Sequence, residues 1–217
     1  MYNYILFDLD GTLVDTKEGI TKSVQYSLTD FGIHIKDLDE LTAFIGPPLG
    51  SQYGEIYGMD EQQVTRAVAL FRQRYEKTGI FECSLFPGIK ALLESLKAAG
   101  KNLAVATSKI ESSAVIVLEH LGISSYFDII AGGDLKNTRS TKALVVDAVL
   151  NFYGITEDKK HSAVLIGDTK YDAAGAVQCG IDCIGVAHGY AKDGELIEAG
   201  AVAVVPNAAA LYEKLGI

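Results

Sequence analysis

Residues 4–13, Tyr4-Ile5-Leu6-Phe7-Asp8-Leu9-Asp10-Gly11-Thr12-Leu13, begin as an apolar run typical of a β-strand and end on two carboxylates one residue apart. A buried strand of a parallel sheet has its carboxyl end at the crevice where open α/β sheets bind ligands, so we expect Asp8 and Asp10 at such a site. Two negative charges about 4 Å apart, at an effective dielectric constant of about 20, repel by about 4 kcal/mol. Either a bound cation offsets this repulsion, or one acid keeps its proton. Both outcomes are useful in catalysis.

A β-hairpin is the alternative structure for this stretch, because Asp-Gly is a favoured turn dipeptide and single aspartates often cap helices. A second stretch weakens that interpretation: residues 163–172, AVLIGDTKYD, are again an apolar run that ends on carboxylates. Between the two, the strand-like residues 103–108, LAVATS, end on hydroxyl side chains, and Lys142 opens a helix-like stretch. The order along the chain is acid pair, hydroxyl, lysine, acid pair.

This order resembles the motif order of the haloacid dehalogenase superfamily of phosphotransferases, and the resemblance covers essentially the whole chain. The first motif of that family is Asp-x-Asp-Gly-Thr-Leu after a hydrophobic strand, and the second is a Thr or Ser that ends a strand. A lysine and a Gly-Asp-x-x-x-Asp motif follow. The matching positions here are residues 8–13, Thr107, Lys142 and residues 167–172. Four motifs in the family's order are far more specific than one short motif alone.

The length suits a core with a smaller insert, since 217 residues are many for one compact domain and few for two average ones. The formal net charge of −9 argues against nucleic-acid binding, where a basic face supplies most of the affinity. The cysteines Cys83, Cys179 and Cys183 are odd in number and lack zinc-site spacing, so we expect reduced thiols. No leader-like segment or membrane-length apolar run is present. We expect a cytoplasmic protein without a membrane partner, as a monomer or weak homodimer.

Residues 15–84 show helical periodicity and few strand signals. Asp37 with an acid three residues later, and Pro48, mark two further helix starts. In the family that the chain resembles, an insert at this place is the cap. We therefore predict an all-helical cap over residues 15–84 and a catalytic core formed by residues 1–14 and 85–217. The stripes at helical spacing are Ile20, Val24, Leu28 and Phe31, then Val64, Val68, Phe71 and Tyr75.

From residue 85 onward the pattern alternates between helix and strand, which predicts right-handed crossovers and a parallel sheet. The fold class is therefore α/β, a Rossmann-like parallel sheet flanked by helices, with the cap inserted after the first strand. Expected helices cover residues 89–99, 112–121 and 142–153, and expected strands cover residues 103–107, 129–131 and 202–205 and lie near Val164 and Ile184.

The resemblance implies a role for each carboxylate of the first motif. Asp8 is the expected nucleophile, which attacks phosphorus and forms an aspartyl-phosphate. Asp10 is the expected acid and base: it protonates the leaving oxygen and then deprotonates the attacking water. Dehalogenases of the superfamily lack the second acid, so carbon–halogen hydrolysis is a poor interpretation of this chain.

Oxygen ligands of this kind suit a hard cation, and Mg²⁺ is the expected cofactor. The resemblance implies that Asp8 and Asp168 bind it directly and that Asp10 binds it through the backbone carbonyl. Asp172 is also placed at the metal, in direct contact or through a metal-bound water that it positions, and it is alternatively expected to orient Lys142. The purely structural alternative is that Asp168 and Asp172 cap the helix that follows them.

The phosphate of the substrate is expected to bind Thr107, the backbone amide of Ser108 at a helix N-terminus, and Lys142, whose positive charge also stabilises the transition state. Lys109 and Lys170 lie beside motif positions, but surface lysines are the better interpretation of both. In the cap, residues 46–49, Gly-Pro-Pro-Leu, also resemble phosphoglycolate-phosphatase-like members, and their rigid turn is expected to present Gly46 and Pro47 as substrate contacts. Helix initiation explains the same prolines.

The third motif reads Arg139-Ser140-Thr141-Lys142, whereas sugar-phosphate mutases of the superfamily commonly carry Lys-Pro there. This difference favours the phosphoglycolate-phosphatase-like branch. The prediction is a Mg²⁺-dependent phosphatase of a small phosphorylated metabolite, with phosphoglycolate, nucleoside monophosphates and pyrophosphate as open candidates. The alternatives are a sugar-phosphate phosphomutase, which would depend on a bisphosphate activator, and a non-catalytic binding homologue, which would be expected to lack a motif carboxylate.

Overall fold

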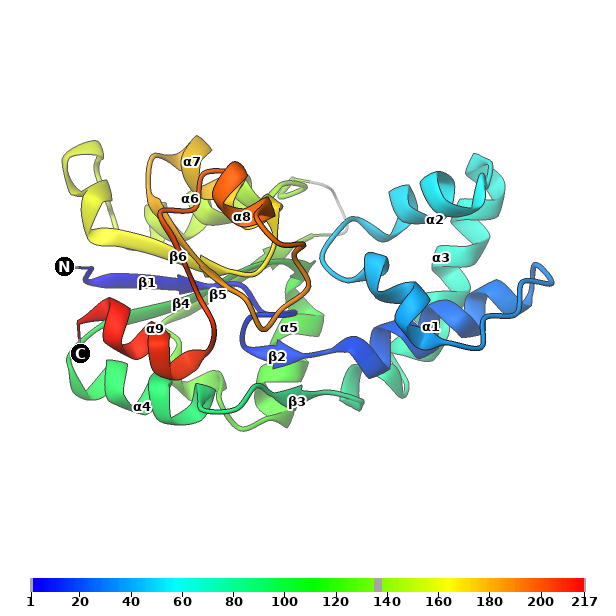
Figure 1. The fold of residues 1–217 in the computed structure, drawn as a ribbon, viewed down its shortest axis with the longest axis horizontal. Coiled ribbons are helices and arrows are strands. Elements are labelled where there is room, and N and C mark those ends of the chain that lie inside the picture. Colours follow the sequence, from blue (N-terminus) through cyan, green and yellow to red (C-terminus); the bar gives the residue numbers. More distant parts are fainter. Residues whose placement is uncertain (1, 135–137, 217) are drawn as a thin grey trace. The chain divides into compact units, whose positions relative to one another are not determined.

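The computed structural model describes residues 2–134 and 138–216 (Figure 1). Its contacts divide the chain into two compact units, Met1–Val14 with Leu85–Ile217, called the core below, and Asp15–Ser84, called the cap. Residues 1, 135–137 and 217 of the predicted core lie outside the described residues. Where the chain passes between the units, β2 (Val14–Asp15) and β3 (Ser84–Leu85) pair as a two-stranded sheet. The all-helical prediction for the cap omitted these two short strands.

The core contains a six-stranded sheet in the order β5-β4-β1-β6-β7-β8 (Figure 1). Every strand pair in it is parallel, which confirms the predicted Rossmann-like fold class. β1 is central, and the register aligns its last residue, Phe7, with Val105 on one side and Ile166 on the other. The strands are β1 (Tyr4–Phe7), β4 (Asn102–Ile110), β5 (Ile129–Gly133), β6 (Ala163–Gly167), β7 (Asp182–Val186) and β8 (Ala203–Val205).

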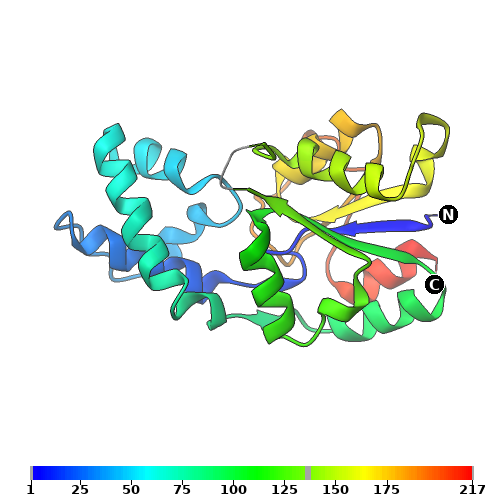
Figure 2. The same cartoon turned by 180° about the vertical axis from the view of Figure 1, so that it is seen from behind.

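Helices cover both faces of this sheet (Figures 1 and 2). On one face, the apolar sides of α6 and α7 pack in one buried cluster with Leu6, Ala104 and Leu165 of the central strands. Burial of these side chains supplies the main force that holds helices to sheet. The first face carries α6 (Lys142–Phe152), α7 (Lys170–Cys179) and α8 (Glu195–Glu198), and the second carries α4 (Ile89–Ala98), α5 (Glu111–His120) and α9 (Ala208–Leu215).

The end of β4 differs from the prediction, and the difference affects the site. The strand continues past Thr107 to Ile110, with a register shift against β5 between Ala106 and Ile110. The carboxyl end of β5 supplies Gly132 and Gly133, where a β-carbon would come within 2.6 Å of Lys109 O and 2.8 Å of Ser108 O, respectively. Two consecutive glycines therefore let β5 approach the irregular end of β4.

The cap consists of α1 (Lys17–Thr29), α2 (Leu49–Tyr57) and α3 (Glu61–Tyr75), with 3₁₀ segments at Leu38–Phe44 and Gly79–Phe81. Asp37 accepts a hydrogen bond from Asp39 N at the start of the first 3₁₀ segment, where the sequence indicated a helix start. Tyr53 is fully buried, and its hydroxyl lies 2.5 Å from Ser27 Oγ of α1. Burial raises the pKa of Tyr53 to about 12. The cap therefore has its own small apolar core.

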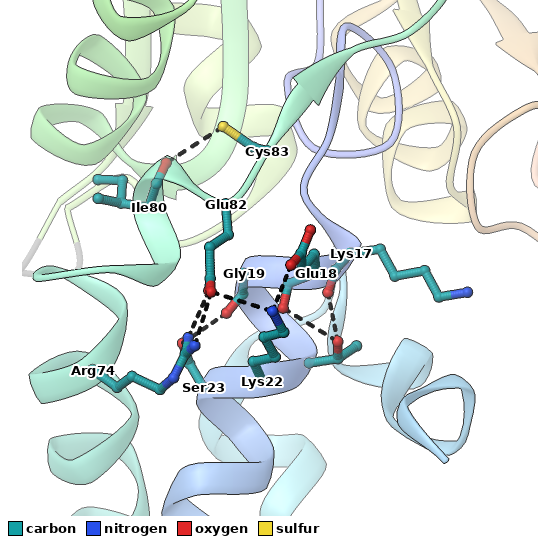
Figure 3. Close-up of polar contacts among 10 residues, drawn as sticks. Lys17, Glu18, Gly19, Lys22, Ser23, Arg74, Ile80, Glu82 and Cys83 are labelled. Atoms are coloured by element: carbon teal, nitrogen blue, oxygen red, sulfur yellow. Dashed lines mark hydrogen bonds and ion pairs between the residues drawn. The ribbon is translucent and has the colours of Figure 1, made fainter.

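An ion-pair network ties the end of the cap to its beginning (Figure 3). Arg74 of α3 donates to both carboxylate oxygens of Glu82, at 2.8 and 3.0 Å, and Lys22 of α1 lies 3.4 Å from the same carboxylate. The backbone carbonyl of Glu82 accepts from Gly19 N at 3.1 Å. Hydrogen bonding to Arg74 lowers the pKa of Glu82. Glu82 thus fixes the segment before β3 against the first turns of α1.

Candidate active site

The site lies at the carboxyl edge of the sheet, where β1, β4 and β6 end side by side. Asp8 directly follows β1, and its backbone amide donates to Ile166 O of β6 at 2.8 Å. Asp168 directly follows β6. Asp8, Asp168 and Asp172 each offer a carboxylate oxygen, and these three oxygens lie within 4.8 Å of one another. The adjacent parallel strands thus bring together acids that are about 160 residues apart in the sequence.

Lys142 is buried beside Asp8 and Asp172 of this acidic cluster. It is the first residue of α6, after the N-cap residue Thr141. Its Nζ lies 2.8 Å from Asp8 Oδ1 and 2.7 Å from Asp172 Oδ1, and it donates to Ala106 O at 3.0 Å. The lysine stem packs against α7 at Gly175, where a β-carbon would come within 2.7 Å of Lys142 Cγ.

Asp168 is held in one orientation by two donors. Thr12 Oγ1 donates to its Oδ1 and the backbone amide of Tyr190 donates to its Oδ2, each at 2.9 Å. Two glycines leave room for this carboxylate, because a β-carbon at Gly11 or Gly189 would lie 2.2 Å from an Asp168 side-chain atom. Gly11 also has a φ of +86°, which side chains other than glycine rarely adopt. Sequence reasoning used Thr12 only as part of a motif and gave Tyr190 no role.

Asp172 both caps α7 and contacts Lys142. Its Oδ2 accepts from the backbone amide and the hydroxyl of Thr169, at 3.0 and 2.8 Å, which caps α7. Its Oδ1 contacts Lys142. Direct metal binding by Asp172 stays a prediction, although the residue belongs to the carboxylate cluster.

The two lysines that sequence reasoning treated alike differ in the structure. Lys170 is a surface lysine as expected, with a side chain that is 52% exposed and an ion pair to Glu195 at 3.1 Å. The same interpretation is wrong for Lys109, whose side chain is 8% exposed and whose Nζ lies 3.0 and 2.9 Å from the two carboxylate oxygens of Asp10. The signal was available in the sequence: Lys109 is two residues after Thr107, so both can lie on one face of a strand.

Thr107 is buried in β4, and its hydroxyl accepts a hydrogen bond from Lys109 N at 3.2 Å. The expectation for Ser108 is corrected: this exposed residue lies within β4, and the following helix, α5, starts only at Glu111, so its amide is not at a helix N-terminus. Gly46 and Pro47 are partly buried residues of the cap, and Gly46 has a φ of +96°. Their contact with substrate stays a prediction.

Burial opposes the ionisation of two carboxylates of the cluster, Asp8 and Asp168. The pKa of Asp8 is raised to about 6, because burial and the neighbouring Asp172 and Asp10 outweigh the attraction of Lys142. Burial, Asp172 and Asp8 likewise raise the pKa of Asp168 well above its ordinary range. Burial alone would lower the pKa of Lys142, but Asp172 and Asp8 raise it above its usual value. One lysine therefore does not balance three buried acids.

A bound divalent metal ion would balance the excess negative charge of the three buried aspartates. Three buried aspartates present oxygen atoms close together, and oxygen is the ligand that hard divalent cations prefer. A cation there would favour the ionised carboxylates and act against the burial and mutual repulsion that raise the pKa values of Asp8 and Asp168. The donor set is all oxygen, so it suits Mg²⁺ or Mn²⁺ better than a soft metal.

In the metal-free protein, Asp8 is expected to lower the free energy of unfolding as the pH rises from about 4 to above 6. Asp8 has a folded-state pKa of about 6 against an ordinary value of 3.8, so its contribution is fully present below the ordinary value and is lost through the raised one. Denaturant unfolding in a chelator, at intervals of pH, measures this. Asp8→Asn is the control. The other titrating groups are common to both proteins, so the difference between their slopes of unfolding free energy against pH is due to Asp8. A divalent metal that binds the cluster should flatten the slope. Equal slopes with and without Asp8 would contradict the prediction.

The comparisons with known proteins agree with this geometry. Residues 5–186 match the haloacid dehalogenase-like hydrolase family, and the chain belongs to that family. A 5'-nucleotidase of Pseudomonas aeruginosa is 41% identical over 90% of this chain and 87% of that protein. A phosphoglycolate phosphatase of Nitrosospira multiformis is 30% identical, over 96% of this chain and 92% of its own length. The tyrosine-protein kinase PtkA of Mycobacterium tuberculosis is 35% identical over 98% of this chain and 72% of that protein.

A crystal structure of a predicted phosphatase from Clostridium acetobutylicum superposes with a TM-score of 0.92 and is 43% identical, covering 99% of this chain and 98% of that one. The chain is thus an enzyme of the phosphatase type, with the phosphoglycolate-phosphatase-like character expected from its motifs. No helix within residues 2–134 and 138–216 combines the length and apolar character that crossing a membrane requires.

Proposed function

We propose that the chain is a Mg²⁺-dependent phosphomonoester hydrolase that acts on a small phosphorylated metabolite through an aspartyl-phosphate. The observation that carries the proposal is the buried contact of Lys142 with Asp8 and Asp172, beside Asp168. A nucleophilic carboxylate, a fixed cation and additional carboxylates for a metal are the groups that phosphoryl transfer requires, because catalysis there is mainly positioning and charge stabilisation.

In the first step, a carboxylate oxygen of Asp8 bonds to the phosphorus atom and the bond to the leaving oxygen breaks. Asp10 gives its proton to that oxygen, so the leaving group departs as an alcohol. In the second step, Asp10 takes a proton from a water molecule, whose oxygen bonds to phosphorus and releases Asp8. Inorganic phosphate then leaves, and both acids return to their starting protonation states.

Asp8, Asp168 and the backbone carbonyl of Asp10 would hold the metal ion, with Asp172 in direct or water-mediated contact. The bound ion would supply positive charge to phosphate oxygens and to the carboxylates around them. Thr107 and Lys142 would bind the transferring phosphoryl group, and Ser108 would contribute its backbone amide from the end of β4 rather than from a helix. Lys142 would also stabilise the charge that develops in the transition state.

A nucleoside monophosphate or a phosphoglycolate-like molecule is the proposed substrate class, supported by relatives named as a 5'-nucleotidase and as a phosphoglycolate phosphatase. Gly46 and Pro47 of the cap are the proposed contacts for the leaving group. The proposal includes a cytoplasmic monomer or weak homodimer without a membrane partner. The net charge of −9 supports the further proposal that the protein has no nucleic-acid partner.

Phosphate release from a panel of phosphorylated metabolites, with Mg²⁺ and with a chelator, tests the proposal. The panel should contain nucleoside monophosphates, phosphoglycolate, sugar phosphates and pyrophosphate. We expect release that needs the metal and that is strongest for one substrate class. Absence of release from every compound would overturn the hydrolase. Conversion of a sugar phosphate only with a bisphosphate activator would indicate a mutase, and transfer from ATP to protein tyrosine would indicate a kinase.

A further inference from the structure

We propose that Lys109 is a positioning residue that holds the carboxylate of Asp10 in place for proton transfer; this inference rests on the proposed function. Lys109 Nζ lies 3.0 Å from Oδ1 and 2.9 Å from Oδ2 of Asp10. The two side chains are only 8% and 13% exposed, so solvent screens their attraction little. A lysine that reaches both oxygens restricts rotation of the carboxylate about its Cβ–Cγ bond.

The irregular end of β4 makes this contact possible. Lys109 follows Thr107 by two residues, and its backbone amide donates to the Thr107 hydroxyl at 3.2 Å. The register shift between Ala106 and Ile110 lies at this point, and such irregularities often redirect side chains beside active sites. The strand that supplies a predicted phosphate-binding hydroxyl therefore also supplies the lysine that holds the predicted acid and base.

Two different lysines contact the carboxylates of the first motif. Lys142 contacts Asp8 and Asp172, whereas Lys109 contacts Asp10. The separation keeps Asp10 out of the buried acidic cluster, although only one residue lies between it and Asp8. Proton transfer needs the carboxylate within hydrogen-bond distance of the leaving oxygen, and a misplacement of about 1 Å can cost roughly a hundred-fold in rate. Lys109 acts on the reaction through Asp10.

The test compares two leaving groups in the complete protein. An alkyl phosphate needs a proton on its leaving oxygen, whereas p-nitrophenyl phosphate departs as a stable anion. For Lys109→Met, we expect kcat/KM for the alkyl phosphate to fall roughly a hundred-fold, within the range of general acid catalysis, and kcat/KM for p-nitrophenyl phosphate to fall less than about five-fold. Lys109→Arg should recover part of the loss. Lys170→Met is the matched control and should leave both values unchanged, since Lys170 is an exposed lysine beside the fourth motif.

A double-mutant cycle with Asp10→Asn decides whether Lys109 works through Asp10. In the Asp10→Asn protein, adding Lys109→Met should cost nothing further for the alkyl phosphate. This pair also replaces both charges, so the comparison remains possible if the single lysine variant does not fold. The proposal would be overturned if Lys109→Met lowered kcat/KM equally for both leaving groups or did not lower it at all. It would also be overturned if the losses from the two substitutions multiplied in the double variant. If the wild-type protein releases no phosphate at all, the failure lies in the proposed function instead.

Discussion

Asp8→Asn is expected to lower phosphate release by roughly ten-thousand-fold or more while the protein stays folded. The loss follows from removal of the nucleophile, since an amide oxygen does not form the phosphoenzyme, and loss of a nucleophile has the largest effects seen in comparable enzymes. Stability should not fall with activity. The pKa of Asp8 is raised to about 6, so Asp8 is ionised at neutral pH at a cost to the free energy of folding, and a neutral amide of the same shape avoids that cost.

Phosphate release and denaturant unfolding, both measured at pH 7.5 or so, check this prediction. In a chelator, Asp8→Asn should match or exceed the wild-type free energy of unfolding, by a margin on the order of 1 kcal/mol. Asp193→Asn is the matched control, because it makes the same change at an exposed position of the core. A variant that keeps more than about a hundredth of the activity would exclude Asp8 as the nucleophile; Asp8→Ala guards against recovery through deamidation.

Lys142→Met is expected to lower both activity and stability. Nζ of Lys142 lies 2.8 Å from Asp8 and 2.7 Å from Asp172, and its side chain is 4% exposed. Removing one partner of a buried ion pair commonly costs about 3–5 kcal/mol, because the other partner is left charged without compensation. Catalysis should fall by roughly a hundred- to a thousand-fold, as when one stabilising donor is removed from a transition state.

A more specific test measures how the stability lost in Lys142→Met depends on Mg²⁺ and on pH. Mg²⁺ should restore part of the lost stability by supplying positive charge to the same carboxylates, and the deficit should shrink as the pH falls and the acids take up protons. Lys101→Met is the control. Lys101 is also buried, but it lies just before β4, at the opposite end of the sheet from the site, and its Nζ donates to Tyr2 O. That variant should lose stability and keep its kcat/KM. A Lys142→Met protein with wild-type kcat/KM would remove Lys142 from the mechanism.

Lys142 and Lys109 give Asp8 and Asp10 different surroundings at one edge of the sheet. Asp8 lies in a buried group whose charge balance needs an additional cation, whereas Asp10 has its own partner, Lys109. Different surroundings for two neighbouring carboxylates are how enzymes give them different tasks. The sequence places both acids in one motif, and only the tertiary structure shows which lysine contacts which acid.

The sequence by itself determined the parallel α/β class and the ends of the strands on which the acids sit. The reason is local: an apolar run such as residues 163–167 predicts a buried strand, and in the structure the same residues form the buried strand β6. Lys142 and the carboxylates could be found because each follows a strand or opens a helix, and the carboxyl ends of parallel strands share one edge. The family resemblance added roles that local pattern does not contain.

The tertiary structure alone decided which charges meet. The partner of Lys109 is 99 residues away in the chain, and the sheet order, in which β1 lies next to β4, makes that contact possible. The same holds for the bond between Tyr190 and Asp168, and for Ser108, whose place in a strand depends on a register shift beside Gly132 and Gly133. Secondary structure follows largely from near neighbours, whereas burial and ion pairing depend on residues that folding brings from elsewhere.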